Sequence, residues 1–162
     1  MRALLLLATT LVAGCGFQLR GTAELPFDTL YLPPSKVPGI VLDLRRNVQA
    51  GTRTQIVDDP KKAEAVMDFT QESREKVILS LTAEGRVREY TLRYRVGFRV
   101  HDAKGGDFVP VTTIQLQRDV TFNDTAVLAK ESEEAELYRD MQSDMVRQIM
   151  NRLAAAKRPQ PQ

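Results

Sequence analysis

The sequence predicts one α+β domain, because the spacing of its apolar residues changes from two to about four along the chain. Apolar and polar residues alternate strictly over residues 88–100, whereas apolar residues recur at helical spacing over 40–48 and 137–153. The 162 residues, 43% of them hydrophobic, suffice for one core and leave no room for a second large domain. The expected order is a short strand, a helix, three strands joined by tight turns, and a longer helix.

A short strand and a helix are expected first. Residues 29–32 form the strand, which ends at Pro33 and Pro34 because proline cannot donate to a strand ladder. Residues 35–50 are expected to form an amphipathic helix that stops at Gly51. Its apolar residues are Ile40, Val41, Leu44 and Val48. Asp58, Asp59 and Pro60 then mark a turn.

Residues 63–81 give a mixed pattern. Apolar residues typical of strands occur in two groups, over 66–69 and 77–81. The polar interval 70–76 between them fits a bulge, a turn or a solvated strand. All three alternatives remain open.

The clearest pattern is a long strand between Arg88 and Val100. One parity is apolar and consists of Tyr90, Leu92, Tyr94, Val96, Phe98 and Val100. The other parity is polar and basic, which predicts one buried face and one wet face. Residues 83–85 and 102–107 are expected to be tight turns. A further alternating run over 112–122 supplies a partner strand, with Arg118 interrupting its apolar face.

The last predicted element is a long amphipathic helix after Asn123 and Asp124. Its apolar residues at steps of four are Leu137, Met141, Met145, Ile149 and Leu153. Acidic residues at its start and basic residues towards its end suit the helix dipole. We expect the methionines to be core residues rather than part of a cofactor site, and residues 156–162 to form a short flexible tail.

Residues 1–14 have the form of an export signal. An apolar or small run from Ala3 to Gly14 follows one basic residue and is too short to span a membrane as a helix. It ends in Val12-Ala13-Gly14-Cys15, which contains the single cysteine of the chain. The segment resembles a bacterial lipoprotein signal, which is cleaved before a cysteine that carries N-palmitoyl and S-diacylglycerol groups. An ordinary signal with a chance cysteine, or a buried core cysteine, is the alternative.

Composition argues against nucleic-acid binding and against most catalysis. Lysine plus arginine number 23 against 21 acidic residues, and removal of residues 1–14 takes Arg2 away, leaving 22 against 21 and a net charge of +1. One histidine and one cysteine give a metal site almost no ligands, and no nucleophile-elbow motif is present. His101 beside Asp102 is expected to be a turn contact, while a paired-carboxylate mechanism stays open. We expect no enzyme activity and no cofactor.

Three local strings resemble a known family. They are Cys15-Gly16-Phe17-Gln18-Leu19-Arg20-Gly21, Gly85 followed by Glu89-Tyr90, and Leu128-Ala129-Lys130. In order and spacing they are similar to the LPS-assembly lipoproteins called LptE or RlpB. The resemblance covers residues 15–155 as one domain. It implies a two-layer α+β sandwich, with two helices packed on one face of a four-stranded, mostly antiparallel sheet.

The resemblance also implies a function. Members of this family plug the outer-membrane β-barrel LptD, assist its assembly and bind lipopolysaccharide on its way to the cell surface. Gly16 is not the aspartate that retains lipoproteins at the inner membrane, so the expected location is the periplasmic face of the outer membrane. An adaptor lipoprotein of another outer-membrane assembly complex is the alternative, because it would share the anchor and the fold.

Basic residues are the candidate contacts for the phosphates of lipopolysaccharide. Lys130 is carried over from the family motif, whereas five are inferred from this sequence alone: Arg86, Arg88, Arg93, Arg95 and Arg99. Family members have a basic residue just before the hairpin glycine, where this chain has Glu84. Arg99 shares the wet face of the long strand. Alternatively, the strand arginines form an ordinary solvated face or contact the barrel wall.

Overall fold

The computed structural model describes residues 24–37, 39–122 and 127–159. The elements are β1 (Thr29–Tyr31), α2 (Ile40–Gly51), β2 (Gln55–Val57), a 3₁₀ helix (Pro60–Lys62), β3 (Ala65–Leu81), β4 (Val87–His101), β5 (Asp107–Thr121) and α3 (Val127–Ala154). The predicted signal and Cys15 lie outside the described residues. No helix in the described ranges is long and apolar enough to cross a membrane.

The sheet has five strands in the order β2-β1-β3-β4-β5, so the expected number of four is wrong. β1 pairs in parallel with both β2 and β3, whereas β3, β4 and β5 form an antiparallel meander. β2 has three residues, too few to show an alternating pattern in the sequence. It joins the sheet because α2 provides the crossover that a parallel pair of strands requires.

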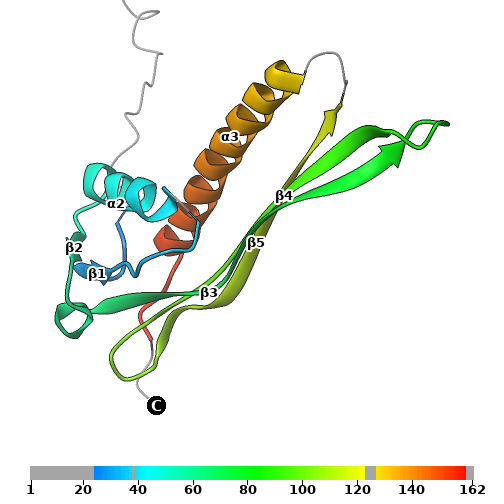
Figure 1. Cartoon of the computed structure of the whole chain (residues 1–162). Coiled ribbons are helices and arrows are strands. Elements are labelled where there is room, and N and C mark those ends of the chain that lie inside the picture. Colours follow the sequence, from blue (N-terminus) through cyan, green and yellow to red (C-terminus); the bar gives the residue numbers. More distant parts are fainter. Residues whose placement is uncertain (1–23, 38, 123–126, 160–162) are drawn as a thin grey trace, which may run out of the picture.

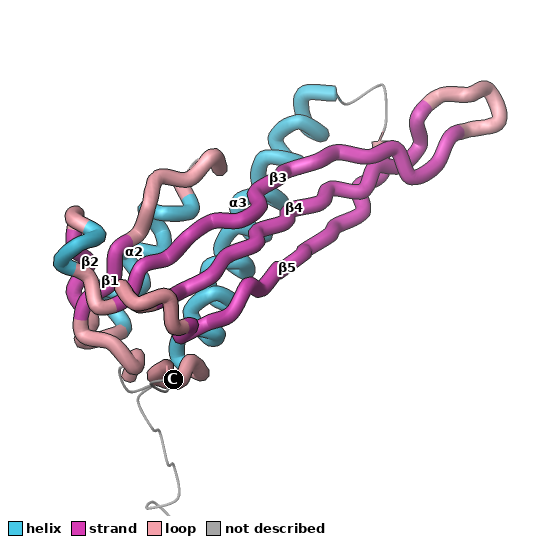
Figure 2. Tube along the Cα trace, turned by 90° about the horizontal axis from the view of Figure 1, so that it is seen from below, coloured by secondary structure: helices cyan, strands magenta, loops and turns pink. Residues whose placement is uncertain are grey.

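Both helices cover the same face of the sheet, which gives the predicted two layers (Figures 1 and 2). The apolar parity of β4 faces them, and Leu92, Tyr94, Val96, Phe98 and Val100 are each 0% exposed. The helices bury Met141, Met145, Ile149 and Leu153 of α3 and Ile40, Leu44 and Val48 of α2. The predicted alternation of β4 and the assignment of the methionines to the core are confirmed.

Three local details refine the predictions. α2 begins at Ile40 and not at residue 35, because Gly39 has a left-handed φ of +85° that cannot continue a right-handed helix. Arg118, which interrupts the apolar face of β5, donates a hydrogen bond to Asp144 of α3 at 3.1 Å. Beyond α3, Ala156 packs against the core.

The polar interval 70–76 belongs to β3, a continuous strand of 17 residues. A register shift between Phe69 and Gln71 leaves Thr70 without a partner on β4, which is a β-bulge. Gly97 of β4 faces this bulge, and an added Cβ there would lie 2.6 Å from the Thr70 hydroxyl oxygen. The polar residues that face the helices after the bulge each lie opposite a buried residue of β4, and they are Glu72, Arg74 and Lys76.

The β3–β4 hairpin extends past the end of α3 (Figure 1). Its turn closes through a hydrogen bond of 2.7 Å from the Thr82 amide to the Arg86 carbonyl oxygen. Gly85 in this turn has a φ of +78°, which glycine adopts without strain. The predicted turns at 83–85 and 102–107 are confirmed.

Candidate functional site

The sheet separates the candidate basic residues into groups. Arg93 and Arg95 lie on the face of β4 away from the helices, because they alternate with its buried residues. Lys130 lies on α3, which covers the other face. Arg86 and Arg88 lie at the β3–β4 turn and the start of β4. Arg93 and Arg95 therefore do not share one site with Lys130.

The open face of the sheet carries guanidinium groups beside neutral amides. Arg95 donates two hydrogen bonds to Oε1 of Gln115 on β5, from Nε at 3.1 Å and from Nη2 at 2.9 Å. Arg93 lies between Glu75 on β3 and Gln117 on β5 in the strand register. Within the described chain it has no hydrogen-bond or ion-pair partner, and its Nε is buried. Arg93 and Arg95 thus form no ion pair within the described residues, although Glu75 lies opposite Arg93 in the register.

Arg99, on the same face, supports the β4–β5 turn. Its Nε donates to the carboxylate of Asp107, and its Nη2 donates to the Gly105 carbonyl oxygen at 2.9 Å. Both partners belong to the turn or to the residue that follows it. Arg99 is therefore a structural residue in this arrangement.

Lys130 has a carboxylate partner on its own helix. Its Nζ donates to Glu133 at 2.7 Å, one turn further along α3. The Lys130 side chain is 21% exposed, so the ammonium group is partly covered. A phosphate that approaches Lys130 must compete with Glu133, which lowers the expected contribution of this lysine.

Arg88 lies at a second irregularity, near the end of the hairpin. The register shifts between Ser80 and Leu81, which leaves Arg88 without a partner on β3. Its side chain is exposed and forms no hydrogen bond or ion pair with the rest of the described chain. Its carbonyl oxygen accepts a hydrogen bond from the Phe122 amide at 2.8 Å. Phe122 follows β5 directly, so the hairpin end and the start of α3 lie at the same end of the molecule (Figure 1).

The hairpin turn contains an acid next to the glycine. Hydrogen bonds from the Thr82 hydroxyl and from its own amide hold the pKa of Glu84 below its usual value. Glu84 stands where the resemblance leads us to expect a basic residue. The basic residues next to the turn are Arg86 and Arg88, on the returning side of the hairpin.

A polar network between β3 and the helices has no counterpart in the sequence predictions. The Arg74 guanidinium lies over the rings of Tyr94 and Tyr138, 4.7 and 5.5 Å from their centroids. It donates to Gln142 of α3, and Gln142 donates to Asp43 of α2. Burial raises the pKa of Tyr94 and of Tyr138. The network thus connects β3 to both helices.

Lys76 extends this network towards the hairpin. Its Nζ lies 2.6 Å from the Glu134 carboxylate on α3 and 4.3 Å from the centroid of the Tyr90 ring. The Tyr138 hydroxyl donates to the Glu75 carbonyl oxygen at 3.0 Å. Polar contacts therefore help to hold the first half of α3 against β3.

His101 and Asp102 form a turn contact, as predicted. The His101 Nδ1 lies 2.7 Å from the carbonyl oxygen of Asp102, and its Nε2 lies 3.0 Å from the Asp68 carboxylate. The Asp102 carboxylate instead accepts hydrogen bonds from the amides of Lys104 and Gly106. Among the described residues, no group of three or more His, Cys, Asp or Glu side chains could hold a metal ion.

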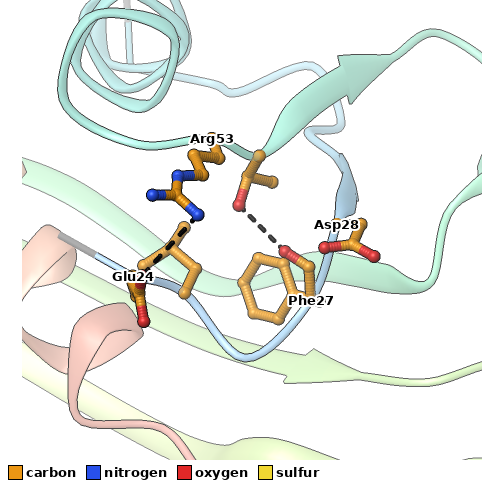
Figure 3. Close-up of a pocket in the computed structure, with 6 residues that line it drawn as sticks. Glu24, Phe27, Asp28 and Arg53 are labelled. Atoms are coloured by element: carbon orange, nitrogen blue, oxygen red, sulfur yellow. Dashed lines mark hydrogen bonds and ion pairs between the residues drawn. The ribbon is translucent and has the colours of Figure 1, made fainter. Parts of the chain in front are cut away.

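A small pocket lies beside β1 and the segment before β2 (Figure 3). It has a volume of about 210 Å³ and is lined by Glu24, Leu25, Phe27, Asp28, Arg53 and Thr54. Arg53 lies 3.9 Å from Glu24, and the Thr54 hydroxyl donates to the Phe27 carbonyl oxygen at 2.9 Å. Ligand pockets usually exceed roughly 300 Å³, and these polar groups already have partners within the chain. We do not assign a ligand to this pocket.

Comparison with known proteins identifies the family. Residues 27–153 match the family model LptE, described as lipopolysaccharide-assembly. The chain belongs to the LptE family. The LPS-assembly lipoprotein LptE of Yersinia enterocolitica is 30% identical over 153 residues, which cover 93% of this chain and 73% of that protein. The predicted membership of this family is thereby confirmed.

Solved structures of lipoproteins share the LptE fold seen here. The solution structure of an uncharacterized lipoprotein B from Nitrosomonas europaea matches this chain with a TM-score of 0.74 and 41% sequence identity. The match covers 86% of this chain and 91% of that protein chain. The crystal structure of the rare lipoprotein B from Shewanella oneidensis matches with a TM-score of 0.66 and 25% sequence identity. That match covers 78% of this chain and 94% of that protein chain. At family level this LptE chain therefore takes part in lipopolysaccharide assembly.

Proposed function

We propose that this LptE-family chain is an outer-membrane lipoprotein that faces the periplasm. Removal of residues 1–14 leaves Cys15 to carry the N-palmitoyl and S-diacylglycerol groups. Support comes from the Val12-Ala13-Gly14-Cys15 string and from the relatives named as lipoproteins. Several acyl chains attach a protein stably to a bilayer. Metabolic labelling with a palmitate analogue tests the anchor: Cys15→Ala should lose the label and the membrane association, and a labelled variant would contradict it.

We also propose that the hairpin end and the start of α3 bind lipopolysaccharide. The observation that carries this proposal is the exposed Arg88, which has no carboxylate partner among the described residues and lies two positions from Arg86. Its planar guanidinium suits a phosphate of lipid A. Lys130 contributes from the start of α3 at the same end of the molecule.

Charge reversal at this end provides the test. Arg86→Asp with Lys130→Asp should lower the affinity for purified lipopolysaccharide, and Arg88→Asp should lower it further, while the barrel still co-purifies. Arg46→Asp with Arg152→Asp is the matched control, because both residues are exposed and lie elsewhere on α2 and α3. Unchanged binding would remove the ligand role, and loss of the barrel would reassign these residues to the protein interface.

The open face of the sheet is proposed to contact the inner wall of an LptD β-barrel, which this chain plugs and helps to assemble. Arg93 lies about 17 Å along β4 from Arg88, so it belongs to a second surface. Barrel lumens are polar, and a face of arginine and glutamine side chains can lie against such a wall without burying apolar groups. Arg93→Glu with Arg95→Glu should reduce recovery of the barrel on co-purification and leave lipopolysaccharide binding unchanged.

An adaptor role in another outer-membrane assembly complex is the second candidate, because the anchor and fold would be the same. Pull-down of the full chain from solubilised outer membranes distinguishes the two. Recovery of a large β-barrel with a soluble periplasmic domain supports the LptD proposal. Recovery of a different barrel complex supports the adaptor role.

A further inference from the structure

The end of the β3–β4 hairpin carries apolar side chains that remain exposed. Ile78, Leu79 and Leu81 are 54%, 53% and 54% exposed, and we call these three residues the hairpin patch. Single exposed apolar residues are common on protein surfaces, whereas a cluster at one projecting end is a feature of binding surfaces. The helix layer does not extend over this end (Figure 1).

The two sides of the hairpin differ in chemistry. The outgoing strand β3 contributes the hairpin patch, and the returning side contributes Arg86 and Arg88. Leu81 pairs with Val87, which lies between Arg86 and Arg88 in the sequence, and paired strands lie about 4.8 Å apart, so the apolar and the cationic residues occupy adjacent backbone positions at the hairpin end. Register shifts on both sides of Ser80 interrupt the regular alternation, and such bulges re-aim side chains.

Aromatic side chains continue the apolar surface into the sheet. Ile78 lies opposite Tyr90 in the register of β3 and β4, and Val120 of β5 lies opposite Tyr90 on its other side. The Tyr90 ring packs edge-on against Phe122, with 5.5 Å between the ring centroids. Tyr90 and Phe122 are both half-buried, so this row joins the exposed hairpin patch to the core.

We propose that the hairpin patch binds an acyl chain of the anionic lipid whose phosphates contact Arg86 and Arg88. This inference rests on the proposed lipopolysaccharide binding and adds which part of the ligand each side of the hairpin takes. An acyl chain is favoured over a protein surface by charge complementarity. A phosphorylated lipid presents an anionic head beside an apolar chain, and the hairpin presents cations beside apolar side chains. Each methylene removed from water raises affinity about fourfold.

Two probes separate the acyl chain from the head group. They are fluorescent lipid A, used below its aggregation concentration, and its fully deacylated, bisphosphorylated disaccharide. The full chain is titrated into each, and anisotropy gives the affinity. Ile78→Thr with Leu81→Thr removes apolar surface without changing the charge and keeps residues that favour strands. Val111→Thr is the matched control, because Val111 is 64% exposed on β5 and adjoins Thr112, which pairs with Phe98 far from the hairpin.

We expect the wild type to bind lipid A at least about tenfold more tightly than the disaccharide. The double variant should lose about tenfold in lipid A affinity, keep its affinity for the disaccharide within about twofold, and keep its melting temperature. Unchanged lipid A binding, or an equal loss for both probes, would overturn the acyl-chain site. If the wild type binds neither probe, the proposed lipopolysaccharide binding itself fails. Loss of barrel co-purification with unchanged lipid A binding would assign the patch to a protein contact.

Discussion

Replacement of Gly97 by alanine tests whether the β3 bulge and this glycine form one unit. The new Cβ would lie 2.6 Å from the Thr70 hydroxyl oxygen, 3.2 Å from the Gln71 Cβ and 3.3 Å from the Gln71 amide nitrogen. The distance of 2.6 Å to the Thr70 hydroxyl oxygen is shorter than Cβ contacts in real proteins. The contact with the Gln71 amide nitrogen involves the backbone, which moves away less easily than a side chain. Overpacking of this kind costs about 1–3 kcal/mol. We therefore expect a loss of about 2 kcal/mol in the free energy of unfolding, or about 4–8 °C in Tm.

A double variant separates the side-chain part from the backbone part. Thr70→Ala removes the nearest oxygen, so Thr70→Ala with Gly97→Ala should regain about 1 kcal/mol relative to the sum of the single changes. Gly51→Ala is the control, because a Cβ added at Gly51 would meet no atom within 4 Å and alanine favours the helix end. Urea unfolding at equilibrium measures the wild type and all four variants. A cost of Gly97→Ala below about 0.5 kcal/mol, or strict additivity, would refute the coupling.

Three more predictions concern buried and turn residues. Burial raises the pKa of Tyr94 above its ordinary 10.0, so this tyrosine ionises first in the unfolded chain and the free energy of unfolding falls as the pH rises past that value. The Tm of Tyr94→Phe should therefore fall less at alkaline pH than the Tm of the wild type. An identical fall in Tm would contradict this. Arg74→Met should lower the free energy of unfolding, measured in urea, by about 1–3 kcal/mol, because it removes a charged hydrogen bond and contacts with two aromatic rings. An unchanged free energy of unfolding would show that this network does not stabilise the fold. Arg99→Ala should lower the free energy of unfolding by about 1 kcal/mol and leave lipid A binding unchanged. Weaker lipid A binding would show that Arg99 contacts the ligand.

The long elements could be predicted because apolar residues recur along them with the period of a strand or a helix and mark the side that is buried. In β4 every second side chain from Leu92 to Val100 is buried, and in α3 the residues at steps of four from Met141 to Leu153 are buried. β2 could not be found in this way, since three residues show no period. The interval 70–76 is polar on both parities, and partners far away in the sequence satisfy its inward-facing residues. Ser35 and the Lys36 amide bond to Glu72, whereas Gln142 and Glu134 of α3 bond to Arg74 and Lys76. Such partners are distant in sequence, so local pattern could not reveal them.

For the candidate site, parity was more informative than charge. The positions of Arg93 and Arg95 on the wet parity already implied that they lie opposite the helix layer, and therefore opposite Lys130. The carboxylate beside Lys130 was also visible as Glu133, three residues later. The exposure of Ile78 was not visible, because an apolar strand residue gives the same signal whether or not a helix covers it. That depends on how far the helix layer reaches.

The reach of the helix layer follows from simple lengths. At about 3.3 Å per residue the 17 residues of β3 extend roughly 56 Å, whereas at 1.5 Å per residue the 28 residues of α3 extend roughly 42 Å. The buried residues of α3 lie between Met141 and Leu153, so its second half covers the core. The sheet consequently projects beyond the helices at the hairpin. Solubility alone would favour polar residues at such an end. The hairpin patch beside Arg86 and Arg88 is therefore best explained by a bound molecule that is apolar on one side and anionic on the other.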